Sequence, residues 1–148
     1  MSIIDNAIAR LAFHALATKY DSTNTIKAAP VYPPESGGLS SPFAVTYLNG
    51  GRMVLQSADT WRFFPTIAVD FHFDISRFKT TYAQINTVIP DFSARLAGDP
   101  TLNGSVSTIT GEVTIDLPTG FDWNGDGRPE TMMVRFSVPV KSLETPTT

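Results

Sequence analysis

Apolar residues recur with helical spacing in two parts of the chain and with strand spacing in most of the rest. The first helical stretch covers residues 3 to about 20, with Ser2 at the N-cap position. A second stretch lies in RFKTTYAQINTV, residues 77–88. Because proline lacks an amide donor and clashes with the preceding turn, Pro90 predicts a kink or a second short helix that closes at Gly98.

A period of two is clearest in TIAVDFHFDIS, residues 66–76, where large apolar residues alternate with Ala, Asp and His. This pattern predicts a strand with one buried face. Earlier in the chain, Asn49-Gly50 separates the β-rich runs FAVTYL and GRMVLQS, and it predicts a tight hairpin turn.

The last part of the chain predicts a long antiparallel hairpin. Residues 113–117 and 132–140 both alternate between apolar and polar side chains, and a polar, glycine-rich loop separates them. Pro139 cannot donate a hydrogen bond to a neighbouring strand, so that end of the strand is expected at a sheet edge or at the strand's finish.

Together these elements predict an α+β fold. We expect a mostly antiparallel sheet of four to five strands, packed against an N-terminal helix and a central, Pro-interrupted helix. The length fits a single domain over residues 1–148. Within it, residues 21–42 are expected to form an extended loop rich in Pro, Gly and Ser, and residues 142–148 a flexible C-terminal tail.

Composition narrows the function classes. The chain has no cysteine, which excludes disulfides and thiolate metal sites. Its net charge of −3 and the lack of any Lys/Arg cluster argue against nucleic-acid binding, which needs concentrated positive charge. Charged residues interrupt the first helix, so it is not expected to be a signal peptide or a membrane span. The chain is therefore expected to stay in the cytoplasm where it is made.

The best catalytic candidates are Asp70, His72 and Asp74, which alternation places on one face of a strand. Such a row could ligate a metal or hold a base. The favoured interpretation is the solvated face of a half-buried strand. His14 is expected to pack or to face water. Since the sequence also lacks a Gly-x-Ser-x-Gly elbow and phosphate-binding glycine patterns, we expect no enzyme.

The loop DWNGDGRPE offers oxygen ligands at every second position. Asp122, Asn124, Asp126 and Glu130 are candidate ligands for Ca²⁺, with a glycine at the sharp bend. An EF-hand is excluded, because Met133 stands where a bidentate glutamate is required. The spacing is closer to the calcium loops of FG-GAP repeats. The alternative is a plain hairpin loop, in which Asp and Asn side chains bond to their own backbone.

Several segments resemble the tail terminator proteins of long-tailed bacteriophages. The resemblance rests on the order of an N-terminal helix and four segments: YPPES (32–36), SPFAVTYLNGG (41–51), TIAVDFHFDIS (66–76) and IPDFSARLAGDPTLNGSVSTI (89–109). It covers roughly residues 3–141 as a pattern of architecture with short local matches. The DWNGDGRPE loop departs from the family pattern.

The resemblance implies a structural virion protein of the tail or neck. Tail terminators form hexameric rings that cap the tail tube, end its polymerisation and give the head connector a docking surface, while genomic DNA passes through the lumen. Trp61, Phe63 and Phe64 are candidate interface residues; the alternative is that they belong to the core. An acidic lumen wall is expected from Asp70, His72 and Asp74, or from Glu112 and Asp116.

Two other functions stay open from the sequence. The first is another subunit of the neck, such as a head-closure protein, or a subunit of the tail tube. The second is a calcium-dependent binding module that uses the DWNGDGRPE loop.

Overall fold

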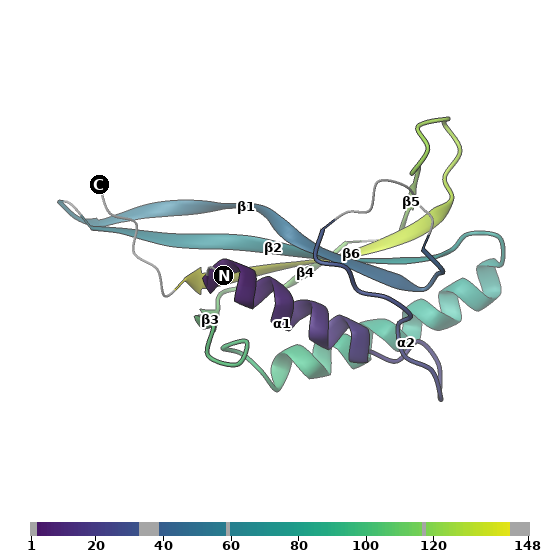
Figure 1. The fold of residues 1–148 in the computed structure, drawn as a ribbon, viewed down its shortest axis with the longest axis horizontal. Helices are drawn as coiled ribbons and strands as arrows, with labels where there is room; N and C mark the ends of the chain where they lie inside the picture. The colour runs from purple at the N-terminus through teal and green to yellow at the C-terminus, as the bar shows by residue number, and fades with distance from the viewer. Residues whose placement is uncertain (1–2, 33–38, 59, 117, 143–148) are drawn as a thin grey trace.

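Two helices lie on one face of an antiparallel, six-stranded sheet (Figure 1), which confirms the predicted α+β class. The structure is a computed structural model that describes residues 3–32, 39–58, 60–116 and 118–142. The predicted N-cap Ser2 and the tail beyond residue 142 lie outside these ranges. The elements are α1 (Ile3–Ala17), β1 (Phe43–Ser57), β2 (Thr60–Asp74), α2 (Phe78–Ala97), β3 (Val106–Ile109), β4 (Thr114–Ile115), β5 (Thr119–Phe121) and β6 (Thr131–Ser142).

The strands follow the order β1-β2-β6, and β3, β4 and β5 share the far side of β6. All of these pairs are antiparallel. The hairpin predicted between residues 113–117 and 132–140 is present in part, since Thr114 and Ile115 pair with β6, while residue 117 lies outside the described ranges. The sheet has six strands rather than four or five, because its far edge is divided into three short strands instead of one.

The hydrophobic core lies between the sheet and the two helices. In β2 the odd-numbered residues from Ile67 to Phe73 are fully buried, as their alternation predicts. Phe92 of α2 meets Phe71 and Phe136 edge to face, with ring centroids 5.0 and 4.8 Å apart. α1 contributes a narrow stripe of small and aliphatic side chains: Ala7, Leu11 and Ala15.

Both helices differ in detail from the prediction. α1 ends at Ala17, and the hydroxyl of Thr18 donates a 2.7 Å hydrogen bond to the carbonyl of His14 just beyond that end. α2 continues from Phe78 to Ala97 with Pro90 inside it, so the alternative of a second short helix is wrong. Pro90 is exposed, on the side of α2 where water can replace its missing amide donor.

The hairpin turn predicted at Asn49-Gly50 is wrong. These residues lie inside β1, which continues to Ser57, and the chain reverses between Ser57 and Thr60. A tight turn of the expected type needs positive φ at both Asn and Gly, yet only the glycines adopt it. Gly50 and Gly51 have φ of 89° and 146° and form a β-bulge, in which β1 gains one residue relative to β2.

The prediction for Pro139 is also wrong, because β6 is a central strand with neighbours on both sides. Pro139 lies opposite Thr66 of β2, and its carbonyl accepts a 2.8 Å hydrogen bond from the amide of Thr110. Its missing N–H would point to the same side as that carbonyl. There the partner of β6 changes from β4 to β3, and Thr110 lies just beyond the end of β3, so the missing donor falls where the regular pairing stops.

Candidate functional site

The sheet extends beyond the helices as a two-stranded arm, formed by residues 48–57 of β1 and 60–66 of β2. Figure 1 shows this arm running past the N-terminal end of α1. Its helix-side face continues the apolar face of the core beyond the helices, and no described residue covers it fully. On it, Leu48, Met53 and Leu55 are 45%, 55% and 51% exposed. The arm is therefore an exposed apolar surface on a regular scaffold.

The three predicted interface residues all lie on the arm. Trp61 and Phe63 stand opposite Leu55 and Met53 on its helix side, and Phe64 points to the other side. Each is half-buried, and none belongs to the core cluster. The guanidinium of Arg52 lies 4.7 Å above the ring of Phe64. The aromatic rings are partly covered within the arm and leave part of their surface exposed.

The outer edge of β1 is covered in its first half only. The carbonyls of Ala28 and Pro30 accept hydrogen bonds of 2.9 and 3.1 Å from the amides of Ala44 and Thr46. Beyond Thr46, no other backbone bonds to this outer edge in the part of the chain that the structure describes. Among the residues that the structure describes, the arm thus has an open strand edge, a surface that favours pairing with another chain.

The interpretation of Asp70 as a solvated residue is wrong. Asp70 is 3% exposed, and its carboxylate accepts hydrogen bonds of 2.8 and 3.1 Å from Arg135 on the neighbouring strand. Tyr47 donates a third, of 2.7 Å. Burial, with the negative charge of Asp70 in addition, raises the pKa of Tyr47 to about 12. This cluster is an internal polar network of the sheet.

His72 is also buried rather than solvated. Its ring stacks on Phe43 at 4.9 Å. Trp123 of the DWNGDGRPE loop and Phe121 at the end of β5 lie against it at 4.8 and 5.3 Å. Its Nδ1 bonds to the hydroxyl of Thr131. Burial lowers the pKa of His72 to about 4, so the ring is neutral at pH 7.

The predicted acidic wall of Asp70, His72 and Asp74 is not formed, because the first is paired with a cation and the second is neutral. Asp74 alone is exposed, and it accepts hydrogen bonds from the backbone and side chain of Ser76 before α2. Glu112 and Asp116 are exposed on the opposite edge of the sheet.

His14 packs against the turn that follows α2. Its Nε2 lies 2.7 Å from the carboxylate of Asp99, which also accepts a 2.8 Å hydrogen bond from Arg10. Burial opposes the ionisation of Asp99, but the hydrogen bonds from Arg10, His14 and the amide of Asn103 outweigh it and lower its pKa to about 2. Asp99 therefore fastens α1 to the segment that leads into β3.

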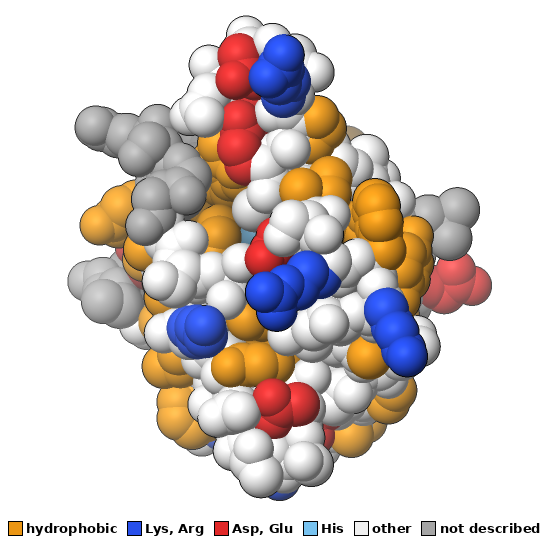
Figure 2. All heavy atoms as spheres, turned by 90° about the vertical axis from the view of Figure 1, so that its right-hand side faces the viewer, with side chains coloured by type: hydrophobic (Ala, Val, Ile, Leu, Met, Phe, Trp, Pro, Cys, Tyr) orange, Lys and Arg blue, Asp and Glu red, His pale blue; other side chains and the backbone are white. Residues whose placement is uncertain are grey.

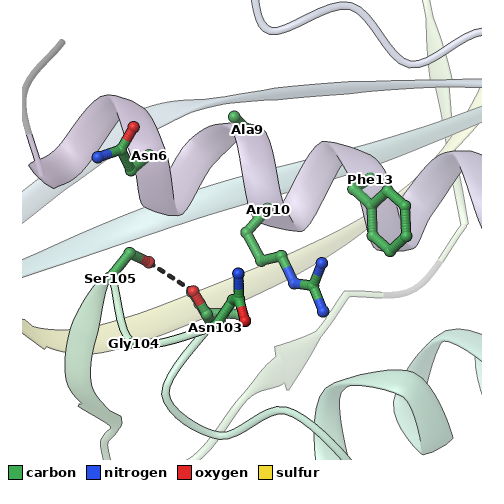
Figure 3. A pocket seen from close by; sticks show the side chains of 8 residues that line it. Asn6, Ala9, Arg10, Phe13, Asn103, Gly104 and Ser105 are labelled. Carbon is green, nitrogen blue, oxygen red and sulfur yellow. Dashed lines mark hydrogen bonds between the residues drawn. The ribbon is translucent and has the colours of Figure 1, made fainter.

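Close to this ion pair, α1 and the segment 102–105 enclose an open hollow of about 460 Å³ (Figure 3). Its lining includes Asn6, Arg10 and Phe13 from α1, with Asn103 and Ser105 opposite. The guanidinium of Arg10 lies 4.6 Å above the ring of Phe13 and bonds to Asp99. Because the guanidinium of Arg10 is already paired with Asp99, the hollow offers little free charge to a ligand.

The DWNGDGRPE loop projects from the face opposite the helices, and Figure 2 shows acidic and basic side chains gathered on this projection. Carboxylate oxygens of Asp122, Asp126 and Glu130 all lie within 4.8 Å of one another. The predicted ligand Asn124 donates its side-chain amide to Glu130, at 2.9 Å. The spacing in sequence thus brings the three carboxylates together, and the side chain of Asn124 lies beside them.

The same carboxylates also bond to their own loop. Asp122 accepts hydrogen bonds from the amides of Asn124, Gly125 and Gly127, and Asp126 accepts one from the amide of Arg128. Slight desolvation opposes the ionisation of Asp122, but these backbone bonds outweigh it and hold its pKa below the usual value. The geometry fits both the calcium loop and the self-bonded hairpin loop.

The sequence indicated neither the exposed residues of the arm nor the partner of Asp70. Alternation in GRMVLQS marks Met53 and Leu55 as one apolar face, but it does not show that the helices stop short of them. Arg135 can be identified as the partner of Asp70 only once the register of β2 against β6 is known.

In the described part of the chain, no helix combines the length and the apolar character that crossing a membrane requires. No protein-family model matches the chain, and no curated protein is found to match it. The function therefore has to be inferred from the geometry of the described residues.

Proposed function

We propose that the protein is a structural virion subunit that forms a hexameric ring, like the tail terminators that its sequence resembles. The ring caps the tail tube, ends its polymerisation and provides the surface on which the head connector docks. Genomic DNA passes through the lumen without sequence-specific binding, for which a net charge of −3 is suited.

The observation that carries this proposal is the arm. It combines an open strand edge with a row of half-exposed apolar side chains, and such edges pair between chains unless they are blocked. A contact between two different surfaces of identical subunits closes into a ring when the rotation between neighbours permits it. The buried polar residues support a structural role, since Asp70 and His72 are engaged inside the sheet.

The test combines mass measurement of the purified protein with negative-stain imaging of its mixture with tail tubes from the same phage. The expected result is a six-fold ring, either in solution or only on tube ends, and a block to further tube growth. A protein that binds neither tube ends nor the connector, or one that turns over a substrate, contradicts the proposal. A ring found at another position in the particle points to a head-closure or tube subunit.

A second candidate is a calcium-dependent binding module, favoured by the three carboxylates of the DWNGDGRPE loop. Their number and spacing suit Ca²⁺, which takes oxygen ligands. In this case millimolar CaCl₂ raises the melting temperature above its value in chelator, and Asp122→Ala removes the difference. An identical melting temperature in both solutions eliminates the module.

A further inference from the structure

We propose that the arm of one copy pairs, through its open β1 edge, with the β4 edge of the next copy. The outer side of β3 is already occupied, since the amide of Ile109 donates a 2.7 Å hydrogen bond to the carbonyl of Pro100. This inference rests on the proposed ring and names the two surfaces that build it. The apolar face of the arm then covers a groove beside the C-terminal end of α2, which is the docking site for the second copy.

The groove is apolar and lies on the edge of the sheet opposite the arm. It has a volume of about 310 Å³, and Ile115 on its rim is 40% exposed. The lining residues come from the end of α2 and from the edge: Ser93, Leu96, Ala97, Pro100, Ile109, Val113 and Ile115. One chain thus carries an apolar projection at one edge of its sheet and an apolar groove at the other.

The strand directions permit this contact. β1 runs parallel to β6, and β4 runs antiparallel to both, because every neighbouring pair is antiparallel. When a second copy is placed beside the first with the same face toward the helices, its β1 lies antiparallel to β4. The two sheets then join into one antiparallel sheet with no reversal of strand order.

The side chains match on both faces of the joined sheet. Ile115 lies opposite Phe136, which contacts α2, so it points to the helix side. Met53 and Leu55 also point to the helix side, through their partners Phe63 and Trp61. Pairing of the two edges therefore brings aliphatic side chains together on the face where the groove lies.

The charges on the two surfaces indicate that a second copy of the chain occupies the groove. On the other face, the arm carries Arg52 and Arg62, while Glu112 and Asp116 lie exposed at the β4 edge. Opposite charges therefore face each other when the arm lies against the β4 edge of the next copy. Two arms placed against each other would instead bring arginines together, so the contact is head-to-tail.

Disulfide trapping tests the contact, because the chain has no cysteine of its own. The Met53→Cys/Ile115→Cys variant should form disulfide-linked multimers on mild oxidation in the presence of tail tubes. Within one chain the two positions are roughly 20 Å apart along the strands, since Phe63 and Val69, which align with them, are six residues apart. That distance is far beyond the roughly 7 Å that a disulfide spans between Cα atoms. The control Met53→Cys/Asn86→Cys should stay unlinked, because Asn86 lies exposed on α2.

Mixing two single variants separates head-to-tail from arm-to-arm contact. Leu55→Glu damages the arm and Ile115→Glu damages the groove, and both positions are exposed enough to leave the fold intact, which thermal unfolding checks. Neither variant should form rings alone. Their mixture should form a one-to-one pair, because each variant retains one working surface.

The outcomes distinguish this inference from the proposed function. If both variants form rings as the unmodified protein does, the contact is wrong and the ring proposal stands. If Ile115→Glu still dimerises through its arms, the head-to-tail geometry is wrong. If the unmodified protein neither forms a ring nor binds tube ends, both proposals fail.

Discussion

Asp70 and Arg135 face each other across β2 and β6, and their side chains form a salt bridge of 2.8 Å inside the sheet. Because Asp70 is almost completely buried and Arg135 about one quarter exposed, the pair depends on mutual neutralisation. Removing one partner leaves the other without its counter-charge in a poorly hydrated position.

We expect Asp70→Ala to lower the free energy of unfolding by about 2 kcal/mol, less than a fully buried pair would lose, since water reaches part of Arg135. Urea unfolding measures this. The double variant Asp70→Leu/Arg135→Leu should recover part of the loss, because it leaves no charge unpaired. If the double variant loses the sum of the two single losses, the pairing is not the source of the effect.

His72 should make stability depend on pH. Its pKa is about 4 in the folded protein and near 6.5 when unfolded, so the unfolded chain takes up a proton first as the pH falls. The contribution of His72 to the free energy of unfolding is fully present above pH 6.5. It declines between pH 6.5 and pH 4, by about 3 kcal/mol in total. His72→Phe should abolish this decline, and His14→Gln should retain it. An unchanged decline in His72→Phe would exclude His72 as the cause.

Asp99 should add a separate loss at lower pH. Its pKa falls from 3.8 to about 2 on folding, so its contribution is present above pH 3.8 and disappears as the pH falls toward 2. Thermal unfolding at pH 4 and at pH 2 should show this loss in the unmodified protein. The Asp99→Asn variant should be less stable than the unmodified protein at pH 4. It should lose less stability than the unmodified protein between pH 4 and pH 2.

Gly51 should tolerate substitution less well than its neighbour. A Cβ at Gly51 would lie 2.7 Å from backbone atoms of Phe64 and Pro65, whereas a Cβ at Gly50 meets nothing within 4 Å. Gly50→Ala therefore carries only the strain of positive φ, about 1 kcal/mol, and Gly51→Ala adds a steric clash for a total of about 3 kcal/mol. Chemical denaturation of the two variants compares them. Equal losses would mean that the backbone at Phe64 and Pro65 moves away from the added Cβ and that close packing at Gly51 is not required.

Asp122 should order the DWNGDGRPE loop without any metal. Asp122→Ala removes the acceptor for three backbone amides, and Asp126→Ala removes the acceptor for one. Amide hydrogen exchange in chelator should therefore accelerate at Gly125 and Gly127 in the first variant only. Equal exchange in both variants would contradict the self-bonded loop.

The sequence predicts the elements of this fold better than their surroundings. The alternation of residues 67–73 fixes a strand and its core face, because that pattern is set by the geometry of the strand itself. It also shows that Asp70 and His72 share a face. Residues far along the chain, chiefly Trp123 and Arg135, cover that face. Local periodicity contains no information about these distant residues.

The failure at Asn49-Gly50 has a related cause. The dipeptide is a good local signal for a turn, but β2 offers an unbroken partner from Trp61 to His72, and pairing along its whole length outweighs the local preference. The glycines are then used for a bulge. For the loop at 122–130, spacing alone brings the three carboxylates together, because all its candidate ligands lie within one short segment.

The short segment that bonds to Ala44 and Thr46 decides how far an incoming strand can slide along β1. A partner edge that approaches from the arm meets this segment and has to stop. Neighbouring copies can therefore overlap only along the arm. Each copy is then displaced from the previous one by a fixed distance along the strand direction. A stop of this kind favours one subunit number over a range of sizes.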